Sequence, residues 1–485
     1  MKMIKRLNMA SLMLMLTLGF VFSQQASDTE KWLADFYQLQ AAISVNYANF
    51  EWLAHDRHVD LLALRQRTEG RLRAAKSDSE RKSAIESFLR AFGDAHVEIK
   101  WGQNPDNRSA SNSPAEPQSF CDRLGYTWQD SNAGINWSIF PEFTPIRDSD
   151  SQDFPAGVLR ITGKPALGVI RIGWFSEYAH PALCRQAQLK EGISDETQCD
   201  DTCQERFQLR VADLLTAALE RRVKTLDEAG AKRILIDITG NGGGTNWVEP
   251  AARVLTPINL GSPRYAFVKH QHWVDQLRLR LNMVEADFVN ANEKHRRLLE
   301  DAAATLRRGI ADAAKPCSLA AYWTDRAPKP GCSNLETAPL YVSGIMPYAR
   351  PGDLAGLKSA SVIFYPSRYR YTEGANRLPL IVLTDGDTGS SAEYFAAMLQ
   401  DNKAALLVGQ VTVGAGCGFT DGGIETKLGN SGAIVRLPDC ARLRADGSNE
   451  VNGIVPDVLL PWVERDSRYQ QAMKLMRWLK ASWVP

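Results

Sequence analysis

Apolar and polar positions along this chain follow two periods, and glycine-rich turns separate the segments. From residue 166 onward, short Val- and Ile-rich runs alternate with longer segments whose apolar residues recur every three to four positions. This is the pattern of strands and amphipathic helices in an α/β core. The run Leu378–Leu383 has the length and composition of a strand buried on both faces. Turn-forming residues connect it to Ala392–Gln400, which is typical of an amphipathic helix.

The same patterns predict most of the remaining elements. Apolar residues at helical spacing predict a helical region over 28–92, and the alternation at Val97 and Ile99 is typical of a half-buried strand. Further strands are expected at 137–140, 157–161, 167–172, 233–238, 404–409, 423–428 and 433–437. Further helices are expected at 207–229, at 246–255 and, as a helical arm, at 274–314.

These elements divide the chain into five regions. A signal peptide is expected at 1–23, a helical N-terminal region at 24–100, a polar loop with a small β-rich module at 101–165, an α/β core with a helical insertion near 270–315 at 166–465, and a C-terminal helix at 466–485. The predicted architecture is therefore one large α/β core with smaller regions before and after it.

The first residues have the composition of a secretory signal. Lys2, Lys5 and Arg6 precede the apolar run Met9–Phe22, and small and polar residues follow. Cleavage is expected after Ser23. A retained membrane anchor is disfavoured because the apolar run is short for a membrane span. The chain is therefore expected to be exported, to the periplasm or the extracellular space, without stable insertion in the membrane.

Charge and cysteine content narrow the possible partners and compartments. The formal net charge is +1, from 57 basic and 56 acidic residues, so nothing attracts the chain to nucleic acid. Eight cysteines, an even number, follow the signal, which favours disulfides in an exported chain. Cys317 with Cys332 and Cys417 with Cys440 are the preferred pairs. The other pairings stay open, since eight cysteines allow about 105 connectivities.

The spacing of histidines and cysteines gives only weak evidence for a metal site anywhere in the chain. Cys199 and Cys203 lie close together, but no matching pair of His or Cys follows them. His270 and His272 lack a third ligand nearby and fit a surface strand or loop better. No metal and no other cofactor is expected.

Ser390 is the residue with the strongest chemical context, because it lies at the junction of the strand, the turn and the helix. Free backbone N–H groups and the positive end of the helix dipole stabilise negative charge at such a position. Taken alone, the serine is better explained as a helix cap. Partners elsewhere in the chain have to distinguish the two interpretations.

Four separated stretches provide those partners. GDAHVEI, LIDITGNGGG, TDGDTGSSAEYFAAMLQD and NEVNGIVPD, in this order, resemble the serine proteases of the C-terminal processing (tail-specific) and tricorn core type, to which the photoreceptor retinoid-binding proteins are related. The resemblance implies a crotonase-like (Clp-type) α/β catalytic core. It covers 165–465 well, except for 256–375, and 30–100 weakly.

The resemblance also assigns roles to residues. Ser390 occupies the position of the nucleophile, with Glu393 as the acid of the S-x-x-E pattern, and Ala415 stands where the processing branch has its lysine base. The sequence is therefore more similar to the tricorn branch, in which a histidine and a glutamate act with the serine. These fall on His96 as general base and Glu450 as the group that orients it, as the chemistry of an activated serine requires.

Backbone N–H groups complete the implied site. The N–H of Ser391 and one N–H of the glycine run form the expected oxyanion hole, with Gly243 preferred and Gly242 close behind, because glycine lets the backbone approach the intermediate. Three positions depart from the family pattern. Ala95 replaces a helper serine, Thr239 replaces an arginine, and Cys417, with its expected disulfide, occupies the turn that normally carries the lysine.

The sequence thus predicts an exported serine peptidase that acts on peptides or proteins through an acyl-enzyme on Ser390. Two alternatives stay open. A hydrophobic-ligand carrier of the same fold would not hydrolyse anything, and an esterase would use the same three residues on small esters; the G-x-S-x-G motif of the common esterase fold is missing. Oligomeric state and cleavage specificity stay open as well.

Overall fold

The computed structural model describes residues 27–102, 119–129, 134–325, 328–329, 331–336, 338–420 and 422–482. The predicted signal peptide and most of the polar loop after Gly102 lie outside the described residues.

A seven-stranded sheet forms the centre of the molecule, in the order β13-β9-β8-β5-β4-β3-β2. Its strands are β2 (Phe143–Ile146), β3 (Ala156–Leu159), β4 (Leu167–Arg171), β5 (Arg233–Asp237), β8 (Leu380–Thr384), β9 (Leu406–Gly409) and β13 (Val458–Leu459). The strands from β13 to β4 run parallel to one another. Strand β3 is antiparallel to β4, and β2 is antiparallel to β3. The predicted α/β core is confirmed, and the β structure expected before residue 165 extends this sheet.

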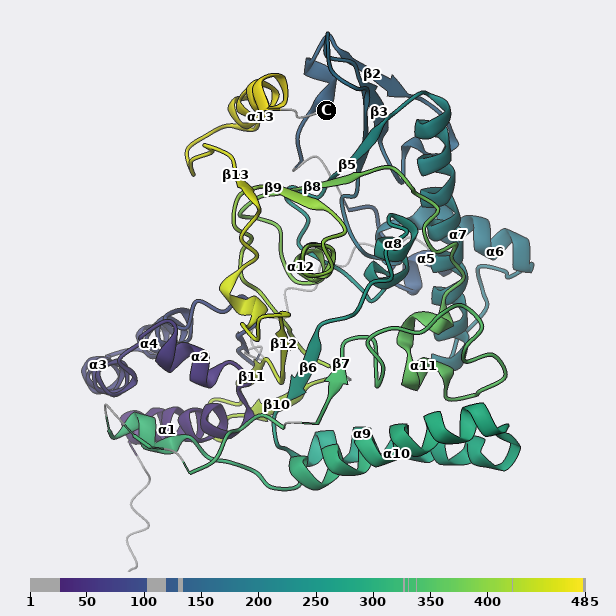
Figure 1. Ribbon diagram of the computed structural model, residues 1–485. Coiled ribbons are helices and arrows are strands. Elements are labelled where there is room, and N and C mark those ends of the chain that lie inside the picture. The colour runs from purple at the N-terminus through teal and green to yellow at the C-terminus, as the bar shows by residue number, and fades with distance from the viewer. Residues whose placement is uncertain are drawn as a thin grey trace, which may run out of the picture.

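Both faces of the sheet are buried, which explains why its central strands read as continuous apolar runs. Successive strand residues point to opposite faces. Ile234 and Ile236 pack with the helices α7 (Asp201–Glu228), α8 (Val248–Val254) and α12 (Ser391–Asp401). On the other face Leu235 packs with the C-terminal helix α13 (Arg468–Ser482), as seen above the sheet in Figure 1.

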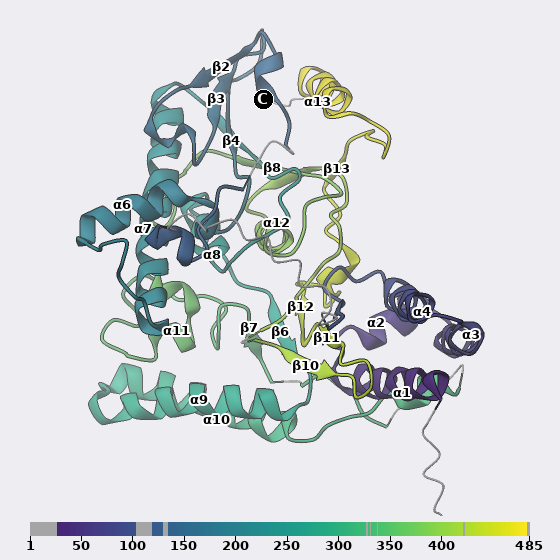
Figure 2. The ribbon, with the colours of Figure 1, turned by 180° about the vertical axis from the view of Figure 1, so that it is seen from behind.

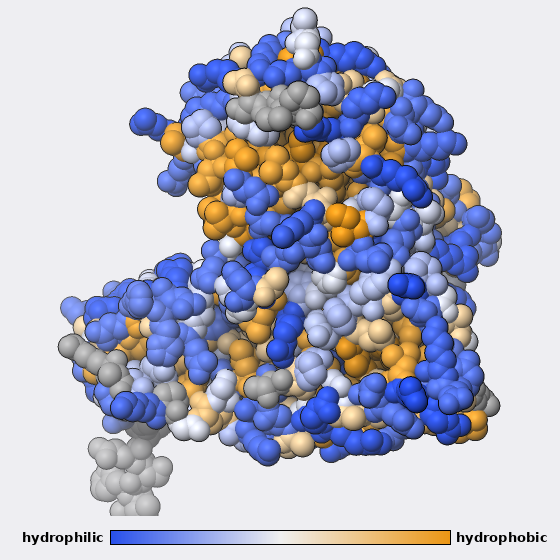
Figure 3. All heavy atoms as spheres, viewed as in Figure 1, coloured by the Kyte–Doolittle hydropathy of each residue, from blue (hydrophilic) through white to orange (hydrophobic). Residues whose placement is uncertain are grey.

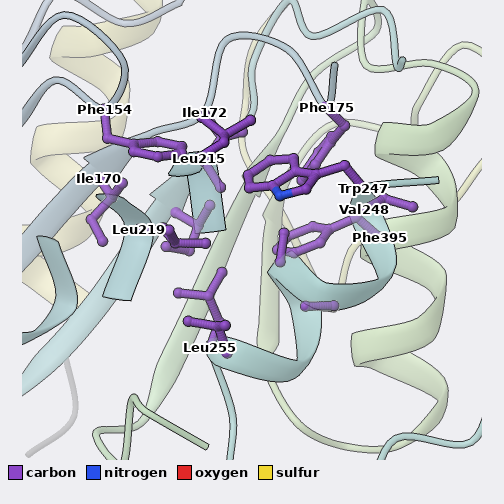
Figure 4. Close-up of a cluster of buried hydrophobic side chains, with 14 of the residues drawn as sticks. Phe154, Ile170, Ile172, Phe175, Leu215, Leu219, Trp247, Val248, Leu255 and Phe395 are labelled. Atoms are coloured by element: carbon purple, nitrogen blue, oxygen red, sulfur yellow. The ribbon is translucent and has the colours of Figure 1, made fainter. Parts of the chain in front are cut away.

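Large aromatic side chains fill the first of these two layers. Phe175 lies 4.8 Å from Phe395 and 6.1 Å from Trp247, measured between ring centroids, and Figure 4 shows Leu215 and Leu219 of α7 in the same cluster. Because α12 is buried on every side except its C-terminal end, its N-terminus is held rigidly against β8. That N-terminus is where Ser390 lies.

The N-terminal region is helical, as predicted. It consists of α1 (Asp28–Asn46), α2 (Phe50–His55), α3 (Leu61–Ala74) and α4 (Asp78–Arg90). Ser27 and Ser77 cap α1 and α4 through their side chains. A second hydrophobic core joins these helices to strands from the C-terminal part of the chain. In the space-filling view the surface is indented between this region and the part that carries α13 (Figure 3).

Two small antiparallel sheets connect distant parts of the chain. One has the order β1 (Glu98–Lys100), β11 (Ile434–Leu437), β10 (Ile424–Lys427), and the other β12 (Cys440–Leu443), β6 (Arg264–Phe267), β7 (Leu340–Tyr341). Glu98 pairs with Arg436 and Lys100 with Ile434. This pairing brings the segment that carries His96 to the C-terminal third of the chain.

The helical insertion consists of α9 (Gln271–Ala286) and α10 (Glu293–Ala313), which lie side by side at the bottom of both Figure 1 and Figure 2. The shorter helices are α5 (Phe120–Arg123), α6 (Pro181–Glu191) and α11 (Ala360–Ile363). None of the described helices is both long and apolar enough to cross a membrane.

One predicted strand is wrong. Residues 137–140 were expected to be extended, but Trp137–Ile139 form a 3-10 helix, η2, because the Asn136 side chain accepts a hydrogen bond from the Ser138 N–H at 3.1 Å. The Trp137 indole turns inward and donates to Asp237 Oδ2 at 2.9 Å.

All eight cysteines form disulfides. The predicted pairs Cys317–Cys332 and Cys417–Cys440 are confirmed. The pairs left open are Cys121–Cys184 and Cys199–Cys203. Four disulfides are compatible with an exported protein.

Candidate active site

Ser390 lies between the end of β8 and the start of α12, as its sequence context predicts. Its backbone has φ 53° and ψ −116°, a conformation that non-glycine residues rarely adopt and that clusters at functional sites. The Ser390 N–H donates to Glu393 Oε2 at 2.9 Å. The surrounding contacts therefore hold a strained serine at the N-terminus of a buried helix.

Glu393 organises the loop that faces Ser390. Its fully buried carboxylate accepts the Thr412 hydroxyl at 2.6 Å and the N–H groups of Gly414 (2.6 Å), Ala415 (2.9 Å) and Gly416 (3.1 Å). With the Ser390 N–H, these bonds satisfy the buried charge entirely from the backbone and one hydroxyl. We call residues 412–416 the carboxylate-bound loop; Glu393 fixes it relative to the serine.

His96 reaches the same loop from the N-terminal region. Its Nδ1 lies 2.9 Å from the carbonyl oxygen of Ala415, the residue at the position of the missing lysine. The ring also lies against Gly418, where an added Cβ would come within 3.0 Å of His96 Cδ2. A side chain at 418 would displace the imidazole, so the glycine makes room for it.

Asp94 supports the backbone of this histidine. Its carboxylate is buried and accepts the His96 N–H at 2.9 Å, the Tyr47 hydroxyl at 2.9 Å and the Asn49 amide at 2.8 Å. Burial raises the pKa of Asp94, and the three hydrogen bonds oppose that rise. The turn before β1 is therefore anchored to the helical N-terminal region.

Glu450 lies close to Ser390 but has a different partner from the one expected. It is the first residue of the 3-10 helix η8 (Glu450–Asn452), its carboxylate is fully buried, and Oε2 accepts from Arg442 Nε at 2.5 Å. The Arg442 guanidinium also donates to the carbonyl oxygens of Ser390 (2.9 Å) and Gly416 (2.6 Å). One arginine thus connects Glu450, the serine backbone and the carboxylate-bound loop.

The glycine run lies against the serine, as the oxyanion-hole prediction requires. A Cβ on Gly243 would lie 2.8 Å from Ser390 Cβ and 2.9 Å from the Ser391 nitrogen. However, the Gly243 N–H already donates to Asn241 Oδ1 at 2.8 Å. Among the described residues, the N–H groups of Gly242 and Ser391 have no such acceptor.

The three predicted catalytic residues are thus connected through one loop, without a direct hydrogen bond between their side chains. In the described part of the chain, no hydrogen bond joins the His96 ring to Ser390 or to Glu450, and Glu450 Oε1 has no partner. Catalytic hydrogen bonds are often long in structures without substrate.

Sequence reasoning missed two residues that contact the site. Arg442 lies on β12, a strand that the patterns did not predict, so no local signal pointed to it. Asn241 was visible in the glycine motif, but its side-chain role requires the folded loop. Of the three departures from the family pattern, Thr239 binds Asp237 Oδ1 through its own N–H and hydroxyl, Ala95 precedes His96, and Cys417 forms a disulfide with Cys440.

The described residues contain no group of three or more His, Cys, Asp or Glu that could hold a metal ion. The His270 side chain accepts from the His272 N–H as the cap of α9. Cys199 and Cys203 are consumed in their disulfide.

Comparisons with known proteins identify the family and the fold. The model of "Peptidase family S41" matches residues 205–460, more than half of the chain. Two structures of mature CPAF, one of them complexed with lactacystin, superpose with TM-scores of 0.58 and 0.55 at 15% identity, covering 93% of this chain and 98% and 96% of theirs. At this identity the likeness concerns the fold. No curated protein matches the chain significantly.

The matched segment contains β8, Ser390, the carboxylate-bound loop and Glu450, while His96 lies before it. The seven-stranded α/β core, the strained serine at a helix N-terminus and the matched family model lead to one identification: the chain belongs to peptidase family S41 and is a serine peptidase.

Proposed function

We propose that the protein is an exported peptidase that hydrolyses peptide bonds through an acyl-enzyme on Ser390, with His96 as general base. The observation that carries this proposal is the hydrogen bond between His96 Nδ1 and the Ala415 carbonyl oxygen. It attaches the histidine to the same loop that Glu393 binds to the serine backbone.

The Ala415 carbonyl also selects the tautomer of His96. A carbonyl oxygen can only accept, so Nδ1 carries the hydrogen, and Nε2 keeps its lone pair. Nε2 then takes the proton of the Ser390 hydroxyl as Oγ bonds to the scissile carbonyl carbon. The imidazolium returns that proton to the leaving amine when the peptide C–N bond breaks. Water, deprotonated in the same way, hydrolyses the resulting ester and regenerates the serine.

Two N–H groups are available for the negative oxygen of the tetrahedral intermediate. We propose Ser391, at the first position of α12, together with the glycine run. Gly242 is now preferred over Gly243 as the second donor, because the Gly243 N–H is bound by Asn241. Gly243 instead lets the glycine run lie close to Ser390, since a side chain at position 243 would collide with Ser390.

Glu450 fits a supporting role that passes through Arg442. Its carboxylate binds the guanidinium, which in turn holds Ser390 O and Gly416 O. We propose that the pair positions the serine backbone and the loop that binds His96, whereas the Ala415 carbonyl takes the orienting task expected of Glu450. Neither Glu450 nor Arg442 needs to exchange a proton in this scheme.

Reaction of the purified protein with a fluorophosphonate tests the proposal. The reagent forms a covalent adduct with an activated serine, and mass spectrometry should find it on the peptide that contains Ser390, with parallel loss of peptide hydrolysis. Comparing turnover of peptides and of small esters distinguishes a peptidase from an esterase. Absence of both labelling and turnover would favour the hydrophobic-ligand carrier.

Replacing His96 with alanine should lower kcat about 10²- to 10⁴-fold, the usual contribution of a general base. Added imidazole should restore part of the activity because the cavity left by the ring can accept it. The matched control is His295→Ala, since the His295 ring also binds a backbone carbonyl, that of Asp353 at 3.0 Å, but on the helical insertion. Wild-type turnover of the His96 variant would mean that another group transfers the proton.

A further inference from the structure

A cavity of about 310 Å³ lies between α4, the segment around His96 and the carboxylate-bound loop. Its walls are mainly carbon, from Leu89, Ala95, Val97, Ile99 and Val413. The volume is at the lower end of the ~300–1,000 Å³ range of small-molecule sites. It suits a single side chain better than a carrier ligand.

The cavity is lined by residues that neighbour the two proposed catalytic residues. Ala95 and Val97 flank His96 in the sequence and lie on one wall. On the other wall, Val413 touches the residue before the nucleophile: a Cβ on Gly389 would lie 2.9 Å from Val413 Cγ1. The cavity thus lies one position along the chain from His96 on one wall, and on the other wall it is lined by a side chain that contacts the residue before Ser390.

The charged groups at the cavity already have partners. Glu86 and Arg90, one turn apart on α4, pair with each other at 3.6 Å. The Asp94 carboxylate accepts its three hydrogen bonds from within the protein. The walls thus present neither an unpaired charge nor a carboxylate free to bind a basic side chain.

Val413 leads toward the cavity as part of an apolar strip. It is 48% exposed and Val411 is 38% exposed, whereas Thr412 between them is buried on Glu393. Two exposed valines thus lie on either side of a buried threonine, and of the two Val413 lies against Gly389, the residue before the proposed nucleophile.

We propose that this cavity binds an aliphatic side chain of the substrate, at a position next to the bond that is cut, and that it makes the enzyme selective for peptides with Val, Leu or Ile there. The inference rests on the proposed function, because it takes Ser390 and His96 as the place of the reaction.

Cleavage of a mixed peptide library, with the cut sites identified by mass spectrometry, tests this selectivity. Wild-type enzyme should enrich Val, Leu and Ile at one position beside the cut. Val413→Asp and Val97→Asp change opposite walls, and each should lower kcat/KM for such peptides at least about tenfold, the cost of a mismatched apolar pocket. Each should also raise the share of cuts beside Lys or Arg.

Val463→Asp is the matched control, since Val463 is 46% exposed and lies outside the cavity, after β13. It should leave the cleavage pattern unchanged. Labelling with a fluorophosphonate that carries no amino-acid side chain separates the two levels of the proposal. If wild type is not labelled, the proposed function fails. If labelling of Ser390 is normal but both cavity variants keep the wild-type pattern, the cavity assignment fails and the function stands.

Discussion

Ser390→Ala is expected to lower kcat for peptide hydrolysis by about four to six orders of magnitude, as loss of a catalytic nucleophile does. The fold should persist, because the hydroxyl is not needed for the contacts that hold this residue. Its N–H binds Glu393 and its carbonyl oxygen binds Arg442, and alanine keeps both groups. Peptide-hydrolysis assays with purified protein measure the loss of activity, and circular dichroism and Tm measure whether the fold persists.

The control for this variant is its neighbour. The Ser391 hydroxyl donates to the Gly244 carbonyl at 3.2 Å, while the proposed catalytic group of this residue is its backbone N–H. Ser391→Ala should therefore still react with a fluorophosphonate, whereas Ser390→Ala should not. If the Ser390 variant keeps full activity, or if the label moves with Ser391, the assignment of the nucleophile is wrong.

Arg442→Met should reduce both stability and activity strongly. Glu450 is fully buried and Arg442 nearly so, and removing one partner leaves an uncompensated buried charge that costs roughly 3–5 kcal/mol. Burial already raises the pKa of Glu450, and the arginine opposes that rise. Without the guanidinium, the Gly416 carbonyl oxygen loses this donor, and the Ser390 carbonyl oxygen keeps only the Tyr394 N–H at 3.1 Å. Chemical denaturation and steady-state kinetics report the two losses.

A second substitution separates positioning from stability. In the double variant Arg442→Met, Glu450→Gln neither charge of this pair is left, so most of the stability should return. The kcat should stay low because no side chain then links the Ser390 carbonyl oxygen to that of Gly416. Arg444→Met is the matched control. Arg444 lies two residues further along the chain and pairs with Asp401 at 2.5 Å, away from Ser390, so its loss should affect stability more than turnover. If both stability and kcat recover in the double variant, Arg442 and Glu450 have a structural role only.

Local signals predicted much of the fold and part of the site. The strand before Ser390 and the helix after it occur within one or two residues of their predicted limits, because a buried parallel strand and an amphipathic helix each leave a pattern within a short window. The N-terminal helices were predicted from the same kind of pattern. The two predicted disulfides were found because each joins cysteines that are close in the sequence. The strand predicted at residues 137–140 was wrong because a run of four apolar and polar residues, taken without its surroundings, fits a strand and a capped 3-10 turn equally well.

The sequence alone could name Ser390, His96 and Glu450 as a set, since each lies in a motif that resembles one family. It could not say which atoms meet. His96 and Ala415 are 319 positions apart, and they meet because β1 pairs with β11 and because Glu393 folds the loop around its carboxylate.

The tertiary structure also decided which partner each polar group has. Glu450 binds Arg442 rather than His96, and Asn241 occupies the N–H of Gly243. The reason is physical. Secondary structure follows from propensities and periodicity within about ten residues, whereas a buried charge or N–H must find a partner wherever the chain brings one, and only the packed core determines which groups arrive.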